Sequence, residues 1–242
     1  MILAIALACS TFLSTLLGGI VALKNRDRLH RILGLTAGVI LGVIAFELLP
    51  EIFEIVHQQG IDSTWPMIAL VLGFLVFHIA EKTIAMHHAH DEEYQDHKHP
   101  KIGLASASAL VGHSFLDGVG IGLGFQAGEV VGISVAIAVI AHDFADGLNT
   151  VSLMLNHYNT RKRALVLLIL DALAPVLGAL STLFFALNDT ALCLYLGFFT
   201  GFLLYIGASD ILPEAHSKHP SKLTMLLTVL GVVFMFVVTR FV

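Results

Sequence analysis

The feature that most constrains this chain is a series of long apolar segments, each about as long as one bilayer crossing. The 242 residues are 57% hydrophobic and only 13% charged, whereas an ordinary soluble domain carries about a quarter charged residues. A soluble fold could not cover so much apolar surface with so few charges. Backbone polar groups in lipid must bond within their own element, so we expect the segments to be helices.

Eight segments are long and apolar enough to predict an all-α membrane protein with about eight transmembrane helices. They lie at 2–23, 31–56, 64–85, 102–125, 129–154, 163–187, 191–212 and 221–242. We treat 1–242 as a single transmembrane domain. The first segment has no basic residue before its apolar stretch, so we interpret it as a span rather than a cleaved signal peptide.

The basic residues predict how these spans are oriented. Twelve of the thirteen Lys and Arg residues lie in or beside the connections after spans one, three, five and seven, and only Arg240 does not. The positive-inside rule places these connections in the cytoplasm. Both chain ends are therefore predicted to be extracytoplasmic.

Two short motifs each occur twice, which predicts an inverted-repeat helix bundle. Residues 113–118 read HSFLDG and residues 142–147 read HDFADG, in spans four and five. Residues 47–51 read ELLPE and residues 210–214 read DILPE, in spans two and seven. The predicted orientation makes the members of each pair run in opposite directions, as in the inverted repeats of membrane transporters.

The repeated motif of spans four and five places ionisable side chains in the middle of the membrane. His113 and Asp117 are four residues apart and share a helix face, as do His142 and Asp146. Such groups cost roughly 2.5–3.5 kcal/mol each on insertion scales, and a bound divalent cation would offset that cost. Imidazole nitrogens and carboxylate oxygens from facing helices suit a borderline cation. The alternative is a structural His–Asp hydrogen bond that fixes helix packing.

Further polar residues extend this candidate site. Additional ligand candidates are Asp143, Ser114 and Asp171, the last of which lies one turn before Pro175. Candidate entrance and exit groups are Glu47 and Glu51 near the outer face, and Asp210, Glu214 and His216 near the inner face. The alternative for residues near span ends is that they are simply solvated.

The one sizeable hydrophilic segment, about 86–101, is predicted to be a cytoplasmic loop. It contains His87, His88, His90, His97 and His99. Histidine-rich tracts bind metal by composition, and we expect the segment to be disordered without metal. The alternative is a flexible solvated linker.

The repeated motifs, the His-rich segment and the eight spans together resemble the ZIP (Zrt/Irt-like) metal transporters, in a bacterial-type form. In that family span four typically reads His-Asn-Phe-x-Asp-Gly. The resemblance covers essentially the whole chain and implies that His113, Asp117, His142 and Asp146 bind the metal. It implies uptake of Zn²⁺, or of Fe²⁺, Mn²⁺ or Cd²⁺, toward the cytoplasm.

Two departures from the family pattern bear on the site. Many bacterial members carry Glu directly before the span-six proline, where this chain has Ala174, and span five has Ala145 in place of the usual proline. The first departure favours one principal metal position over a pair. The four motif-bearing spans, two, four, five and seven, are expected to form the ion-carrying bundle.

The sequence therefore predicts a multi-pass transporter of the inner (plasma) membrane, not an enzyme, whose cargo is a divalent cation and which has no separate cofactor. The expected partners are the metal ion and the lipid bilayer, with a homodimer left open and no nucleic acid. Two alternatives stay open. One is an intramembrane metalloenzyme, although His-Glu-x-x-His is absent from the sequence. The other is a cation-coupled carrier of another solute.

Overall fold

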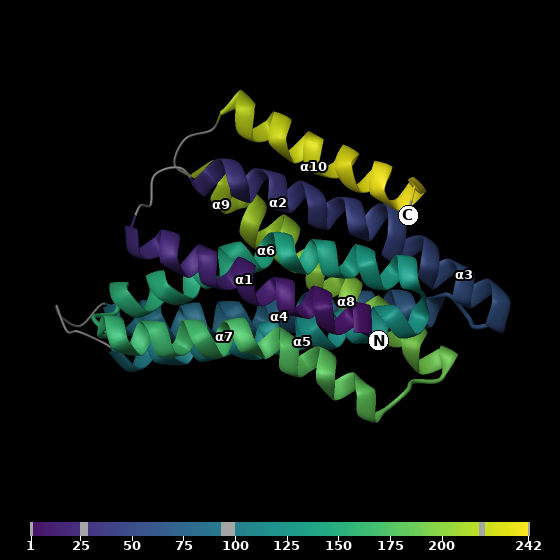
Figure 1. Cartoon of the computed structure of the whole chain (residues 1–242), viewed down its shortest axis with the longest axis horizontal. Helices are drawn as coiled ribbons and strands as arrows, with labels where there is room; N and C mark the ends of the chain where they lie inside the picture. Colours follow the sequence, from purple (N-terminus) through teal and green to yellow (C-terminus); the bar gives the residue numbers. More distant parts are fainter. Residues whose placement is uncertain (1, 25–28, 93–99, 218–220, 242) are drawn as a thin grey trace.

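In a computed structural model, the chain folds into helices that run roughly along one axis and are joined by short connections (Figure 1). The structure describes residues 2–24, 29–92, 100–217 and 221–241. These residues contain no β-strand, which agrees with the predicted all-α class. The start of the first helix and the end of the last lie toward the same end of the bundle (Figure 1).

The helical elements follow the predicted spans closely. They are α1 (Ile2–Lys24), α2 (Leu29–Val43), the π-helix η1 (Ile44–Leu48), α3 (Leu49–Gln59), α4 (Thr64–Glu92), α5 (Pro100–Ala127), α6 (Glu129–Asn156), α7 (Arg161–Ser181), the 3₁₀-helix η2 (Thr182–Phe184), α8 (Asp189–Leu204), the π-helix η3 (Tyr205–Ile211), α9 (Leu212–Ser217) and α10 (Lys222–Phe241). The elements α2, η1 and α3 form one unbroken helical run, as do α8, η3 and α9.

Local side-chain chemistry sets several of these boundaries. The α3 helix ends at Gly60, whose φ of 63° lies in the left-handed region that glycine adopts without strain. Thr160 accepts a hydrogen bond from the Arg163 amide at the start of α7. Asn188 does the same for the Ala191 amide at the start of α8. Such caps satisfy amides that have no partner within the helix.

Six helical segments in the described residues are long and apolar enough to cross a membrane. They lie along α1, α5, α6, α7 with η2, α8 with the start of η3, and α10. The apolar part of α4, Thr64–Ala80, is shorter, and the predicted span 31–56 is not among the six. The count of eight spans and the orientation of the chain ends therefore stay predictions.

The His-rich segment differs from its prediction at its beginning. The α4 helix continues to Glu92, so residues 86–92, which we expected to be loop, are helical. No glycine or proline interrupts this stretch, and Ala, Met and Glu favour helix. His87, His88 and His90 thus belong to α4, whereas His97 and His99 lie outside the described residues.

The two repeated Leu-Pro-Glu motifs also share an unusual backbone. Each follows directly on a π-helix, η1 before Pro50 and η3 before Pro213. Proline has no amide hydrogen to donate, and its ring clashes with the carbonyl of the preceding turn. A widened π-turn accommodates that clash, and such turns are frequent at functional sites.

The helices pack as two bundles. The site bundle consists of α1, α5, α6 and α7, with α1 against α6, α5 against α7 and α5 against α6. The frame bundle consists of α2, α4, α8 and α10, with α2 against α10 and α4 against α8. The packing therefore does not group the four motif-bearing helices, because α2 and α8 belong to the frame bundle.

Close glycine contacts in the site bundle repeat the same arrangement twice. A Cβ added at Gly147 of α6 would overlap the Thr15 carbonyl of α1, and one at Gly118 of α5 would overlap the Pro175 carbonyl of α7. Gly118 and Gly147 are equivalent in the repeated motif. The α1–α6 and α5–α7 pairs are thus two copies of one packing unit.

The frame bundle shows the same duplication. A Cβ at Gly38 of α2 would overlap the Thr228 carbonyl of α10, and one at Gly201 of α8 would overlap the Leu70 carbonyl of α4. Because Gly38 and Gly201 stand at equal distances from the Pro50 and Pro213 of their motifs, these pairs also form one packing unit used twice.

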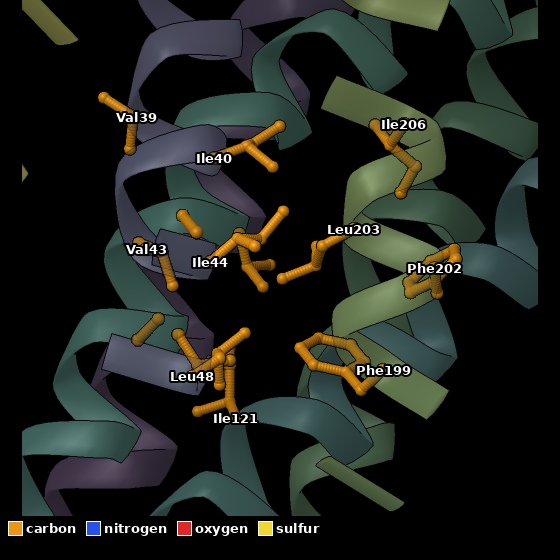
Figure 2. Close-up of a cluster of buried hydrophobic side chains, with 14 of the residues drawn as sticks. Val39, Ile40, Val43, Ile44, Leu48, Ile121, Phe199, Phe202, Leu203 and Ile206 are labelled. Carbon is orange, nitrogen blue, oxygen red and sulfur yellow. The ribbon is translucent and has the colours of Figure 1, made fainter. Parts of the chain in front are cut away.

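An apolar core fills the frame bundle and extends to α5 of the site bundle. Figure 2 shows side chains of α2 and η1 facing side chains of α8 and η3, with α5 beside them. The labelled members are Val39, Ile40, Val43, Ile44, Leu48, Ile121, Phe199, Phe202, Leu203 and Ile206. These apolar residues pack α2 and η1 against α8 and η3, and Ile121 of α5 joins them from the site bundle.

The glycine contacts give a direct stability prediction. Gly201→Ala should destabilise the protein by roughly 1–3 kcal/mol, because the new methyl group meets fixed backbone rather than a movable side chain. Gly112→Ala is the matched control, since a Cβ at Gly112 of α5 would meet no described atom within 4 Å. Thermal unfolding in detergent measures both variants. Equal midpoints for Gly201→Ala and the parent would contradict the close packing.

Candidate metal centre

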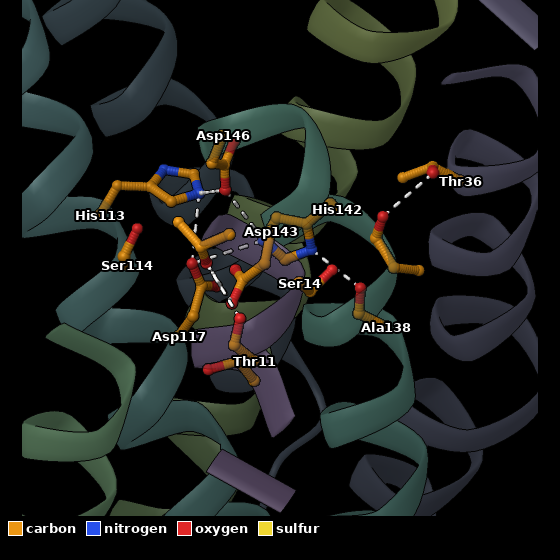
Figure 3. A network of polar contacts seen from close by, with 12 residues as sticks. Thr11, Ser14, Thr36, His113, Ser114, Asp117, Ala138, His142, Asp143 and Asp146 are labelled. Atoms are coloured by element: carbon orange, nitrogen blue, oxygen red, sulfur yellow. Dashed lines mark hydrogen bonds and ion pairs between the residues drawn. The ribbon is translucent and has the colours of Figure 1, made fainter. Parts of the chain in front are cut away.

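Four ionisable side chains from α5 and α6 converge inside the site bundle (Figure 3). Asp117 Oδ2 lies 3.3 Å from His113 Nε2 and 3.4 Å from His142 Nε2. Asp146 Oδ2 lies 3.7 Å from each of the same two nitrogens. Each residue can offer one ligand atom such that all four atoms lie within 4.8 Å of one another. We call these four residues the His/Asp quartet.

The spacing of the quartet suits a small tetrahedral ion. Zinc binds nitrogen and carboxylate oxygen at about 2.0–2.2 Å. A tetrahedron with bonds of that length has ligand atoms about 3.3–3.6 Å apart. The four His–Asp separations of 3.3–3.7 Å are close to that edge length, and all four ligand atoms lie within 4.8 Å of one another. An ion could therefore be held with little rearrangement.

Helix geometry brings the quartet together. His113 and Asp117 project from one face of α5, and His142 and Asp146 from one face of α6, because residues four apart are neighbours on a helix. The single residue Gly128 joins the two helices, so α5 and α6 lie antiparallel. Each histidine then faces both the acid of its own helix and the acid of the other.

The quartet is deeply buried. Asp117 and His142 are fully inaccessible, while the His113 side chain keeps 13% of its exposure. Both Asp117 oxygens and the Nε2 atoms of His113 and His142 have no hydrogen-bond partner among the described residues. Buried polar atoms without a partner are costly and uncommon. A bound cation would satisfy Asp117 Oδ2 and both Nε2 atoms at once.

The ring of His142 is oriented for metal binding. Its Nδ1 lies 2.9 Å from the Ala138 carbonyl oxygen, which can only accept a hydrogen bond. Nδ1 must therefore carry a proton, and in the neutral ring Nε2 presents its lone pair to the quartet. A hydrogen bond of this kind is the usual way in which proteins fix the tautomer of a metal-binding histidine.

Hydroxyl groups tie the α6 backbone around His142 to both bundles (Figure 3). Ser14 of α1 donates to the Ile140 carbonyl at 2.7 Å. Thr36 of α2 donates to the Ala141 carbonyl at 3.1 Å. The second bond crosses from the frame bundle to the site bundle immediately beside a quartet residue.

Three further ligand candidates lie near the quartet but outside it. Asp143 is buried and accepts a long hydrogen bond of 3.4 Å from Thr15, while its Oδ1 has no described partner. Ser114 donates to Asp171 Oδ1 at 2.7 Å, and Thr150 donates to Asp171 Oδ2 at 2.8 Å. Ser114 and Asp171 therefore belong to a separate hydrogen-bonded network.

The protein-family comparison agrees with this arrangement. The family model for the ZIP Zinc transporter matches residues 85–239, which is more than half of the chain and includes the entire quartet. The chain belongs to the ZIP zinc transporter family. A comparison with curated proteins gave no match. Family membership and the apolar helices together make this ZIP protein an integral membrane protein whose cargo is a divalent metal ion.

The predicted entrance and exit groups of the ZIP protein lie on other helical elements than the quartet residues. Glu47 lies on η1 and Glu51 on α3, both partly buried. His216 of α9 bonds through Nδ1 to the carbonyl of Leu212 at 2.9 Å. Asp210 and Glu214 lie on η3 and α9, and their side chains are outside the described part of the structure.

The ZIP protein also surrounds its quartet with residues that sequence reasoning did not single out. The ring of His113 packs edge-on against Phe202 of α8 at 4.7 Å and Phe77 of α4 at 6.2 Å between centroids. Thr150 could have been found, because it lies one turn after Asp146 on the same helix face. No sequence signal identifies Phe77 or Phe202, since aromatic residues are common in apolar spans.

Metal binding to the quartet should stabilise the purified ZIP protein. Zn²⁺ at about one hundred times its dissociation constant contributes roughly 2.7 kcal/mol, which would raise the unfolding midpoint by roughly 5–10 °C. Asp117→Asn should abolish this shift because it removes a charged ligand. Asp143→Asn, outside the quartet, is the matched control and should retain it. Thermal unfolding in detergent with and without chelator measures the shift, and a full shift in Asp117→Asn would contradict the ligand set.

Proposed function

We propose that this ZIP protein moves a divalent metal ion across the membrane toward the cytoplasm and binds it at His113, Asp117, His142 and Asp146. The observation that carries the proposal is the quartet itself. Its ligand atoms are buried and lie within 4.8 Å of one another, and both Asp117 oxygens and the Nε2 atoms of His113 and His142 lack hydrogen-bond partners among the described residues. No purely structural network would leave so many strong acceptors without donors.

Zinc is the cargo that this ligand set suits best. Two imidazole nitrogens and two carboxylate oxygens are ordinary zinc ligands. Fe²⁺, Mn²⁺ and Cd²⁺ accept the same ligand types. The ion would lie at a single principal position, because Ser114 and Asp171 are bonded to each other.

The proposed topology has eight spans, with both chain ends extracytoplasmic. The unbroken run α2–η1–α3 and the helix α4 would supply the two spans beyond the six apolar candidates. The basic residues place the connections after spans one, three, five and seven in the cytoplasm. The ion would then enter past Glu47 and Glu51 and leave past Asp210 and Glu214, near His216 and the His-rich segment.

The duplicated packing supports an inverted repeat, in which α1, α2, α4 and α5 correspond to α7, α8, α10 and α6. The two halves are not in the same conformation. Thr36 bonds to the Ala141 carbonyl and closes α2 against α6. Around Gly112, the counterpart of Ala141 on α5, an added Cβ would have no described atom within 4 Å. His142 is fully buried while His113 is partly exposed, so access to the ion is unequal on the two sides.

Alternating access would exchange these two conformations between the halves. In the present state α8 approaches α5 where Phe199 meets Gly120. Thr36 and Asn149 are the counterparts of Phe199 and Gly120 in the repeat. After the exchange, Thr36 would therefore face Asn149 instead of Ala141. That change of eight residues along α6 corresponds to a slide of about 12 Å between the bundles.

Cysteine crosslinking tests this movement. In a background without Cys9 and Cys193, the pair Thr36→Cys with Ala141→Cys should crosslink in the present state. The pair Thr36→Cys with Asn149→Cys should crosslink only in the exchanged state. Thr36→Cys with Ile133→Cys is the matched control, since it requires an equal slide in the wrong direction. A protease site between α4 and α5 makes each crosslink visible, because the two fragments then stay together on a denaturing gel.

Crosslinking of the Ile133 pair as readily as the Asn149 pair would reject the predicted direction. Complete absence of the Asn149 crosslink in actively transporting vesicles would reject the slide itself.

Metal uptake into proteoliposomes tests the function. The unmodified protein should take up Zn²⁺, and the double variant Asp117→Ala with His142→Ala should lose at least roughly 100-fold of that activity, since both helices then lack a ligand. Glu129→Gln, an exposed residue at the start of α6, is the control. Unchanged uptake by the double variant would reject the site. Uptake of an organic solute without metal would favour the cation-coupled carrier.

A further inference from the structure

Asp171 is a buried acid that the quartet does not use. It lies on α7, is fully inaccessible, and accepts one short hydrogen bond on each carboxylate oxygen. Its donors come from the two helices that carry the quartet, Ser114 from α5 and Thr150 from α6. One carboxylate thus joins three helices of the site bundle at a single point.

The donors sit directly beside quartet residues. Ser114 follows His113 in the chain, and Thr150 lies one turn beyond Asp146. A change in the distance between these two hydroxyl groups would therefore change the distance between the α5 and α6 ligand pairs. The approach of α7 to α5 is fixed in turn by the close contact of Gly118 with Pro175.

The duplicated fold shows that an acid is not required at this place for packing alone. The position equivalent to Asp171 on α1 is Thr11, which is also fully buried. Thr11 donates only to the Ala8 carbonyl of its own helix, at 2.8 Å. A hydroxyl therefore fills the equivalent space, whereas the Asp171 carboxylate holds hydroxyl groups from two other helices at once, one on each oxygen.

We propose that Asp171 is a positioning residue that sets the separation of α5 and α6 at the quartet and thereby its selectivity between small and large divalent ions. It acts through Ser114 and Thr150 and does not touch the ion. The inference rests on the proposed metal site. Cavity size and ligand rigidity decide selectivity among ions that accept the same ligands, so loosening this bridge should favour a larger ion such as Cd²⁺ over Zn²⁺.

Isosteric variants of the full-length protein in detergent test the bridge. Thr150→Val removes one donor without changing volume, and Thr11→Val makes the same substitution at a buried threonine that bonds only within its own helix. Thr150→Ser restores the hydroxyl. Asp171→Asn keeps a group that can bond to both hydroxyls, whereas Asp171→Leu removes both bonds.

Co²⁺ is the probe, because its visible absorption reports the coordination geometry, and competition with Zn²⁺ and Cd²⁺ gives the selectivity. Thr150→Val should weaken Co²⁺ binding roughly tenfold, change the absorption spectrum and raise the preference for Cd²⁺ over Zn²⁺. Thr11→Val, Thr150→Ser and Asp171→Asn should resemble the unmodified protein. A merely structural role would lower stability without changing the spectrum or the selectivity.

Two results would overturn the proposal. In one, Thr150→Val and Thr11→Val give the same spectrum and selectivity as the unmodified protein. In the other, Asp171→Asn fails as completely as Asp171→Leu, which would mean that the charge rather than the bridge matters. If Asp171→Leu does not fold, the comparison of Thr150→Val with Thr11→Val still tests the proposal. Failure of the unmodified protein to bind Co²⁺ at all would instead reject the metal site itself.

Discussion

The structure depends on the burial of two imidazoles and two carboxylates among apolar helices. Removing such groups from water is costly unless each finds a partner, and Asp117 finds no hydrogen-bond donor for either oxygen among the described residues. The rest of the fold offsets the free-energy cost of burying these groups. Glycines allow close backbone contact between helices, and the Ala138 carbonyl of α6 fixes the His142 ring. A transporter needs this combination, since a site fully satisfied by protein groups would not need an ion.

The division into two bundles follows from where close contacts occur. At several glycines an added Cβ would overlap backbone atoms of the neighbouring helix. These glycine contacts join α1 to α6, α5 to α7, α2 to α10 and α4 to α8, so each lies within one of the two bundles. Between the bundles, α5 approaches α8 through the ring of Phe199 at Gly120, and His113 meets only aromatic edges. Interlocked backbone resists sliding, whereas apolar side-chain surfaces permit it. The Thr36–Ala141 bond is a polar contact across this interface, and a single such bond is weak enough to break in a transport cycle.

The helical segments and the grouping of the quartet could be predicted from the sequence, because both depend on residues that lie close together in the chain. Apolar length predicts a helix in lipid, and the i, i+4 spacing of His113 with Asp117 and of His142 with Asp146 fixes which face they share. The grouping of the helices into two bundles could not be predicted, because a membrane helix presents apolar side chains both to lipid and to neighbouring helices. The π-turns before Pro50 and Pro213 were missed because proline predicts a disturbed helix but not which disturbance results. The continuation of α4 to Glu92 was missed because hydrophilic composition was taken to end the helix.

The repeat is symmetric in its packing and in its quartet, but not in the polar groups around the quartet. Position 114 carries a hydroxyl and its counterpart 143 an acid, while Asp171 stands opposite Thr11. In each half an acid and a hydroxyl meet across the same pair of helices, yet the acid has moved from one helix to the other. Asp171 of α7 accepts two short hydrogen bonds, from Ser114 and Thr150. Asp143 of α6 accepts one long hydrogen bond from Thr15 of α1. An exchange of conformations between the halves would therefore leave the four ligands equivalent but not the polar contacts around them.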